Sequence, residues 1–317
     1  MELYHAFPFF FYLLGLCLRK EPLWPSALMK LFKIGAVVLF TFYIIWFPFL
    51  NDLNQIEQVL LRIFPLNRGL FEDKVANFWC SLNVVYKLKT IFDQEKLALI
   101  SAIVTLVGVL PSNLILFMNP TKNQFVCSLL NTALGFFLFS YQVHEKSILI
   151  VALPALMAIR IFNRRYVDLV LLWFLIVTSF SMWPLLVKDG LTLAFVALQT
   201  IFVVICHYIG LFEFDLTEND SMKRSSPKPL TQKDMNKTFW CDWFIWTLFN
   251  FSIIGYLVLS FASLNFKPPS KWPHLWPLLI SVFSAVHFVF FWIYFNYCQL
   301  QSFMNPIPSI SDEKKKK

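Results

Sequence analysis

Two short stretches of the sequence combine side chains that could bind a phosphorylated sugar. The first stretch, residues 68–80, carries these charged, amide and aromatic side chains: Arg68, Glu72, Asp73, Lys74, Asn77 and Trp79. Arginine and lysine can hold a phosphate through charge-assisted hydrogen bonds, and amide or carboxylate groups can bond sugar hydroxyls. The alternative is a solvated loop whose charges pair with one another and whose aromatic side chains lie at a membrane interface.

The second stretch, residues 141–147, lies between two apolar runs and has four candidate binding residues: Gln142, His144, Glu145 and Lys146. Three neighbouring ionisable residues of different kinds in a turn favour a binding role, although a capping turn with a surface ion pair is the alternative. A zinc-peptidase motif is excluded because its second histidine would fall at Ile148. The six cysteines form no Cys-x-x-Cys pair, so we expect no metal site.

The elements that position these stretches are membrane helices. The chain has 58% hydrophobic and only 15% charged residues, with a mean hydropathy of +0.62. Soluble proteins have about 45–50% apolar and about 25% charged residues. Since a spanning helix needs about 20 mostly apolar residues, we expect nine spans, the first a short one. They are 3–18, 28–50, 97–118, 125–141, 147–162, 167–187, 190–211, 240–264 and 275–299.

The basic residues indicate the orientation of these helices. The net charge of +8 could suggest nucleic-acid binding, but the lysines and arginines lie in short loops and at the C-terminus. This distribution is typical of cytoplasmic loops, so we expect no nucleic-acid partner. The basic clusters lie within 19–33, 160–165, 213–239 and 314–317.

Counting crossings from these cytoplasmic clusters places both polar stretches on the outer, lumenal face. We expect a single transmembrane domain, 1–317, in which residues 51–96 form a lumenal loop with an interfacial helix at 76–92. Residues 213–239 form a cytoplasmic loop and 300–317 a cytoplasmic tail.

The tail and the long loop carry two further signals. Lys314 to Lys317 resemble a dilysine retrieval signal of endoplasmic reticulum membrane proteins, which requires a cytoplasmic C-terminus. Glycosylation sequons occur at Asn219 and Asn236, within the loop expected to be cytoplasmic. We therefore expect both asparagines to be unmodified.

Both polar stretches lie in longer motifs that resemble a known enzyme family. The motifs RIFPLNRGLFEDKVANFWC (62–80) and FLFSYQVHEKSILI (137–150) are similar to lumenal motifs of dolichyl-phosphate-glucose-dependent α-1,3-glucosyltransferases. These enzymes act in asparagine-linked glycosylation in the endoplasmic reticulum. The run Arg68 to Lys74 resembles the enzyme that adds the first glucose. The second-glucose enzyme, a non-catalytic protein that binds dolichyl lipids or partner subunits, and a transporter are the alternatives.

The resemblance implies a fold, substrates and site residues. The fold would be the C-terminal part of an all-α polytopic membrane glycosyltransferase of the GT-C class. Its donor would be dolichyl phosphate glucose and its acceptor the mannose-rich dolichyl-diphosphate oligosaccharide, with no cofactor. The family motif maps onto His144, Glu145 and Lys146 as donor-side groups, with His144 a hydrogen-bond donor and Arg68 or Lys146 a phosphate counter-charge.

The chain departs from the family pattern at the catalytic residue. The family's catalytic Asp precedes Tyr-Pro-Pro in the first lumenal loop, and no Asp-Tyr-Pro-Pro occurs in this sequence. We therefore assign no catalytic residue and expect an N-terminally truncated form. A missing general base costs typically about 10²–10⁴-fold in rate, so we expect the chain alone to be inactive or nearly so.

Overall fold

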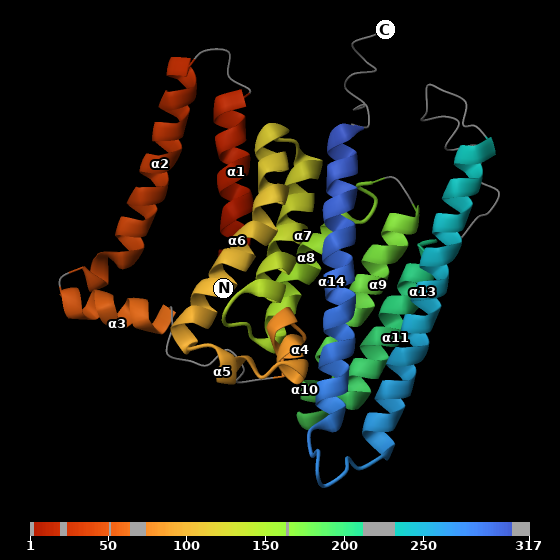
Figure 1. Ribbon diagram of the computed structural model, residues 1–317. Helices are drawn as coiled ribbons and strands as arrows, with labels where there is room; N and C mark the ends of the chain where they lie inside the picture. Colours follow the sequence, from red (N-terminus) through yellow and green to blue (C-terminus); the bar gives the residue numbers. More distant parts are fainter. Residues whose placement is uncertain are drawn as a thin grey trace. The chain divides into compact units, whose positions relative to one another are not determined.

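The computed structural model describes residues 3–19, 24–50, 52–63, 74–162, 165–211 and 232–305, and every regular element in these ranges is a helix (Figure 1). Within these described ranges, five helical segments are long and apolar enough to cross a bilayer, judged by length and composition. They are Trp24–Phe49, Gln94–Met118, Tyr166–Lys188, Trp243–Asn265 and Leu275–Met304. The protein is therefore an all-α, multi-pass membrane protein.

The chain divides into two compact units. Unit 1 comprises Met1–Val151 and Trp292–Lys317, and unit 2 comprises Ala152–Phe291. Helix α8 (Ile148–Ala158) and helix α14 (Leu275–Met304) each contribute to both units.

Unit 1 is built on the helices α1, α6 and α7, which pack against one another. In Figure 1, α3, α4 and α5 lie at the end of the unit where α6 begins and α7 finishes. The elements of unit 1 are α1 (Leu3–Arg19), α2 (Trp24–Trp46), η1 (Phe47–Phe49), α3 (Leu53–Ile63), α4 (Phe78–Val85), α5 (Leu88–Ile91), α6 (Gln94–Met118), α7 (Lys122–Phe139) and η2 (Glu145–Ser147).

Buried hydrogen bonds join α6, α7 and the C-terminal part of α14. The Gln299 Oε1 atom accepts from Ser112 Oγ at 2.6 Å and from Asn131 Nδ2 at 2.7 Å. The Gln299 Nε2 atom donates to the backbone oxygen of Ser112 at 3.0 Å. All three side chains are almost completely buried. Because apolar surface gives no driving force between helices in lipid, such polar contacts and close packing determine which helices associate.

A second buried group of hydrogen bonds lies between α6 and α7. Asn113 Nδ2 donates to Thr132 Oγ1 at 2.8 Å, and Ser128 Oγ donates to Asn113 Oδ1 at 3.1 Å. Glycine allows the two backbones to approach: a Cβ atom on Gly135 would lie 2.8 Å from Val109 Cγ1, which real Cβ atoms do not tolerate. These contacts fix the middle of α7 against α6.

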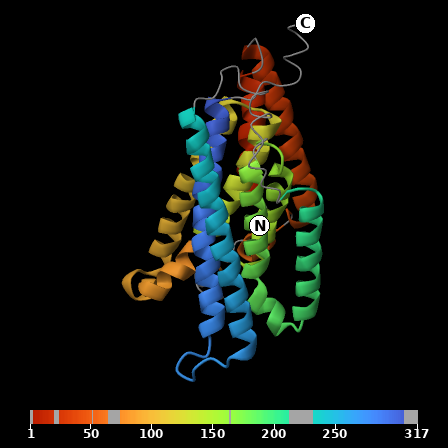
Figure 2. The ribbon, with the colours of Figure 1, turned by 90° about the vertical axis from the view of Figure 1, so that its right-hand side faces the viewer.

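Unit 2 is held by contacts between α13 and its neighbours. Its helices are the remainder of α8, α9 (Arg165–Ser181), α10 (Trp183–Lys188), α11 (Thr192–Tyr208), α13 (Gln232–Asn265) and α14 as far as Phe291. Trp173 Nε1 of α9 donates to Ser252 Oγ at 2.8 Å, and Trp183 Nε1 of α10 donates to Ser263 Oγ at 2.9 Å. Figure 2 shows α13 (cyan) beside the α14 segment that follows it.

All nine segments expected as spans are helical, but their lengths differ from the expected ones. Helix α8 has only 11 residues, about 17 Å at 1.5 Å per residue, instead of the span expected at 147–162. It ends early because Arg160 adopts a left-handed backbone with φ of 69°, and Asp168 Oδ1 accepts the Arg160 N–H at 2.9 Å. The expectation of nine full spans is therefore not confirmed by helix length.

Two other expected segments also have different boundaries. The stretch 76–92, expected as one interfacial helix, forms the two short helices α4 and α5. Helix α13 begins at Gln232, inside the stretch 213–239 expected as a loop. The remainder of that loop and most of the expected tail, 300–317, lie outside the described residues.

Replacing Gln299 by alanine tests the hydrogen-bond network. The Gln299→Ala substitution leaves two buried donors, Ser112 Oγ and Asn131 Nδ2, without their acceptor. We expect it to lower the free energy of unfolding by about 4 kcal/mol, since each of the two unsatisfied donors costs roughly 2 kcal/mol, measured by thermal unfolding in mild detergent. The matched control is Asn250→Ala, because the exposed Asn250 amide donates to the Trp246 carbonyl of its own helix and its loss should have little effect. Equal effects of the two substitutions would contradict the network's role.

Candidate functional site

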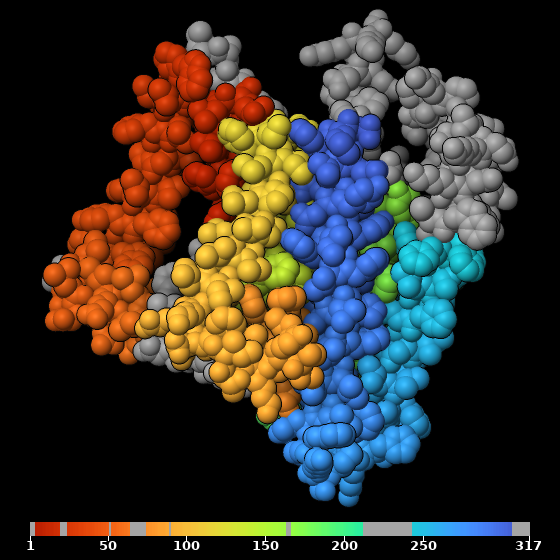
Figure 3. All heavy atoms as spheres, viewed as in Figure 1, coloured from red at the N-terminus to blue at the C-terminus, as the bar shows by residue number. Residues whose placement is uncertain are grey.

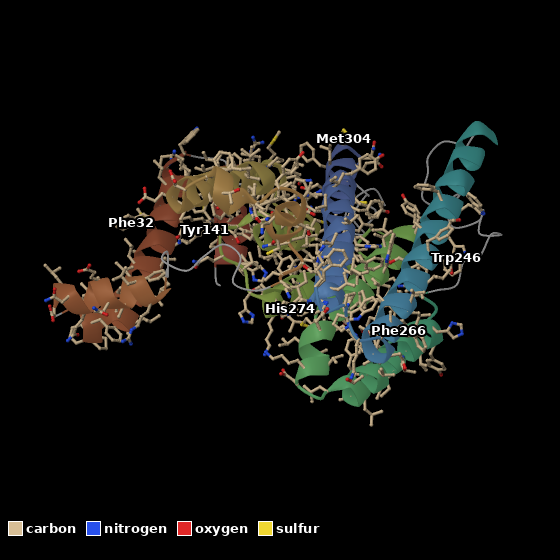
Figure 4. All side chains as sticks on the ribbon, turned by 60° about the horizontal axis from the view of Figure 1, so that its bottom comes forward. Phe32, Tyr141, Trp246, Phe266, His274 and Met304 are labelled. Carbon is tan, nitrogen blue, oxygen red and sulfur yellow. The ribbon has the colours of Figure 1, made fainter. Side chains whose placement is uncertain are left out.

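The second polar stretch begins where α7 ends. Ser140 leaves the helix with an extended backbone (φ −73°, ψ 156°), and His144, also extended, begins the 3-10 turn η2. The Ser147 N–H closes this turn by donating to the His144 carbonyl at 2.9 Å. Tyr141, in this stretch, is labelled in Figure 4. The sequence thus places three ionisable residues in a short, hydrogen-bonded turn.

The turn leaves two hydrogen-bond donors accessible. The backbone N–H of Lys146 donates to His144 Nδ1 at 3.3 Å, so the proton of the neutral imidazole lies on Nε2. The side chains of His144 and Lys146 are exposed, whereas those of Gln142 and Glu145 are half-buried. The turn can therefore offer the imidazole N–H and the ammonium group to a phosphate or a sugar.

Helix α1 supports both ends of this turn. The Tyr4 ring stacks on Phe136 of α7, with centroids 5.5 Å apart, and the Tyr4 hydroxyl hydrogen-bonds with the Ser140 and Ser147 side chains. Ser147 and Ile148 are buried. The backbone on either side of the ionisable residues is thereby anchored, while the side chains of His144 and Lys146 stay exposed.

The first polar stretch is described only from Lys74 onward, and Arg68, Glu72 and Asp73 lie outside the described residues. Lys74 is half-buried, and this burial lowers the pKa of its ammonium group. An anion beside Lys74 would be favoured, because the ammonium has already lost part of its hydration. Asn77 is 2% exposed and caps α4, with its Oδ1 accepting the Cys80 N–H at 2.8 Å. This capping bond gives Asn77 a structural role at the start of α4.

Trp79 joins the two polar stretches. It is 5% exposed, and its Nε1 donates at 2.7 Å to the carbonyl of Phe139, the last residue of α7. The Phe139 ring in turn makes edge contacts with Phe78 at 5.7 Å and with Trp292 of α14 at 5.1 Å. The start of α4 is therefore fixed to the start of the turn that carries His144.

Several residues that shape this site were not singled out from the sequence. Tyr4, Ser140 and Phe139 position the turn without carrying a charge, and Trp79 acts on Phe139 from 60 residues away. No short sequence pattern signals such a pairing. Substrate contacts of Trp79 and Asn77 stay predictions, since both side chains have structural partners.

The candidate site presents cationic and polar side chains. His144, Lys146 and Lys74 provide N–H donors, and Gln142 and Glu145 provide polar groups suited to hydroxyls. In the part of the chain that the structure describes, no three His, Cys, Asp or Glu side chains are grouped as metal ligands would be.

The chain is similar over most of its length to a family of glycosyltransferases. A model of the ALG6, ALG8 glycosyltransferase family matches residues 1–295. A relative from Gallus gallus named dolichyl pyrophosphate Man9GlcNAc2 alpha-1,3-glucosyltransferase is 42% identical over 299 residues, which cover 93% of this chain. The relative of the same name from Mus musculus is 40% identical over 299 residues, again 93% of this chain. The chain spans 57% of the length of each of these two relatives.

Replacing Trp79 by phenylalanine tests whether the indole N–H fixes the turn. The Trp79→Phe substitution keeps an aromatic ring but removes the donor to Phe139. We expect faster hydrogen exchange of the backbone amides in 140–147 and a loss of about 1 kcal/mol in stability. Mass spectrometry of peptides from the exchanged protein measures the first effect.

A matched control exists in unit 2. Trp276 Nε1 donates to the Phe266 carbonyl at 2.7 Å, so Trp276→Phe removes the same kind of hydrogen bond. Phe266 and His274, on the turn between α13 and α14, are labelled in Figure 4. Trp276→Phe should change exchange in that turn and leave 140–147 unaffected. Unchanged exchange of 140–147 in Trp79→Phe would refute the positioning role.

Proposed function

Because the chain belongs to the ALG6, ALG8 glycosyltransferase family, we propose that it serves α-1,3-glucosyl transfer from dolichyl phosphate glucose to dolichyl-diphosphate Man9GlcNAc2. The observation that carries this proposal is the 42% identity, over 93% of the chain, to a relative named for that acceptor. The donor is itself a lipid-linked sugar phosphate, so the proposed reaction needs no separate cofactor.

The proposed donor site is the surface formed by the turn 141–147 and the start of α4. The His144 Nε2–H and the Lys146 ammonium would hold the phosphate of the donor, since both are exposed and close in sequence on an anchored turn. Lys74 would supply a second positive charge on the neighbouring stretch. Gln142 and Glu145 would bond glucose hydroxyls. We assign these residues to binding and none of them to catalysis.

The proposed location is the endoplasmic reticulum membrane, with a cytoplasmic C-terminus and nine membrane helices in a GT-C arrangement. Two observations support it: the basic clusters fall in alternate loops, and within unit 1 α4 and α5 lie at the end of α7 from which 140–147 continues (Figure 1). Both polar stretches would then face the lumen. The lipid-linked donor and acceptor would reach them from the bilayer.

Donor binding gives the direct test of the site. A photoreactive analogue of dolichyl phosphate glucose should label the chain in reconstituted membranes, and unlabelled dolichyl phosphate glucose should compete. We expect His144→Ala and Lys146→Ala each to weaken binding about tenfold, as loss of one charge-assisted hydrogen bond predicts. The control is Lys271→Ala, because Lys271 is an exposed lysine of the α13–α14 turn and lies over the Trp272 ring at 5.9 Å.

Two results would contradict the proposal. One is that photolabelling is unchanged, or falls equally, in the three variants His144→Ala, Lys146→Ala and Lys271→Ala. The other is a preference in the acceptor assay: in membranes that contain the family enzyme with these substitutions, glucose is transferred more readily to an acceptor that already carries one glucose than to the unglucosylated acceptor. That preference would favour the second-glucose reaction instead.

The orientation gives a separate prediction. If 213–239 is cytoplasmic, Asn219 and Asn236 are not glycosylated, and endoglycosidase H should leave the electrophoretic mobility of the expressed chain unchanged. A mobility shift that the double substitution Asn219→Gln, Asn236→Gln abolishes would place this loop in the lumen. The whole orientation would then be reversed.

A further inference from the structure

Helix α3 is an amphipathic helix without a buried side chain. Its apolar residues Ile56, Val59, Leu60 and Ile63 fall on one face at the spacing of a helix. Leu60 is 43% exposed and Ile63 53% exposed, so this face is largely uncovered within unit 1. Figure 3 shows the side chains of α2 and α3 uncovered on the viewed face.

The opposite face of α3 carries both signs of charge and one apolar side chain, that of Leu61, which is 49% exposed. Asn54, Glu57, Gln58 and Arg62 lie on it, and all of them are exposed. A helix with one apolar face, one charged face and no buried residue is suited to the boundary between water and hydrocarbon. It is not suited to crossing the bilayer, because 11 residues rise only about 17 Å.

The preceding helix places α3 at that boundary. Helix α2 has 23 residues, or about 35 Å, against a hydrocarbon thickness of roughly 30 Å. Its charged residues, Lys30 and Lys33, lie in its first half, and no charged residue follows before Asp52. The second half of α2, which ends at Trp46, is therefore apolar up to the far surface of the bilayer. Tryptophan is common at that level of a membrane.

A short segment connects α3 to the end of α2. Residues 47–52 separate the two helices, and Phe47–Phe49 of this segment form the 3-10 helix η1. Asp52 then caps α3, because its Oδ1 accepts the Asn54 N–H at 2.9 Å. Figure 1 shows α3 lying across the end of α2 instead of continuing it. So short a connection keeps α3 at the membrane surface.

We propose that α3 binds the phospholipid surface of the bilayer, with its axis along the membrane plane. The apolar face of Ile56, Val59, Leu60 and Ile63 enters the boundary between headgroups and acyl chains, and Glu57, Gln58 and Arg62 face the headgroups and water. The occupant is lipid because α3 starts at the end of a helix that is long and apolar enough to span the membrane and whose most apolar 18-residue window has no buried residue. This inference needs only the membrane helices and does not depend on the proposed glucosyl transfer.

Fluorescence quenching at two neighbouring positions tests the proposal. The substitutions Leu60→Cys and Gln58→Cys place a cysteine on the apolar and the polar face of α3, about 200° apart around the helix. Neither residue is buried, so neither substitution disturbs the core. Cys80 and Cys241 are replaced by serine in both variants, and the buried cysteines Cys17, Cys127, Cys206 and Cys298 remain. Each variant of the whole chain is labelled with an NBD fluorophore in phosphatidylcholine vesicles.

Two quenchers report on the two environments. We expect phosphatidylcholine with a nitroxide at acyl carbon 5 to quench the label at 60 about threefold more than the label at 58, and aqueous iodide to show the reverse order. Iodide quenching that is equal at both positions would place α3 in water and overturn the proposal. A label at 60 that neither quencher reaches would show that protein covers this face, which overturns it as well. Equal lipid quenching at both positions would also overturn it, because α3 would then have no face fixed toward the bilayer.

Discussion

The hydrogen bonds of Gln299 are the constraint on which the arrangement of unit 1 depends. Apolar side chains cannot select partners in a bilayer, because lipid tails solvate them as well as other helices do. A buried amide can select its partners, because each polar group left without a hydrogen bond in hydrocarbon costs several kcal/mol. The amide of Gln299 satisfies Ser112 of α6 and Asn131 of α7 at once, so it specifies which three helices meet.

The position of the candidate site follows from the packing of α6, α7 and α14 that the Gln299 hydrogen bonds determine. Once α7 is held against α6 and α14, its last residue, Phe139, has a defined place beside Trp292. Trp79 then attaches α4 to the Phe139 carbonyl, and Tyr4 of α1 contacts Ser140 and Ser147 on either side of the turn. Buried contacts inside the membrane helices thus determine where exposed groups such as His144 lie at the surface.

The sequence predicted those features that depend on apolar length. Each of the nine expected segments is helical, because a run of apolar residues in a bilayer must satisfy its backbone internally. Helix ends were less predictable: α8 stops near Arg160 because Asp168, in the next helix, binds its backbone. Helix α3 went unnoticed because a search for long apolar runs does not detect an 11-residue amphipathic helix. At the candidate site, the two polar stretches could be recognised in the sequence, but the hydrogen bond from Trp79 to the Phe139 carbonyl could not be predicted from it.

Polar residues in this sequence can have two roles, helix association or ligand binding, and their location in the structure distinguishes the two. Asn131 and His144 are both polar residues near the same helix, α7, but Asn131 is 1% exposed and bonded to Gln299, whereas His144 is exposed on an anchored turn. A buried polar group in a membrane helix holds helices together, and an exposed one beyond the helix end is available to a ligand. By this criterion Asn77 and Trp79 belong with the residues that build the site, and His144 and Lys146 with those that can bind at it.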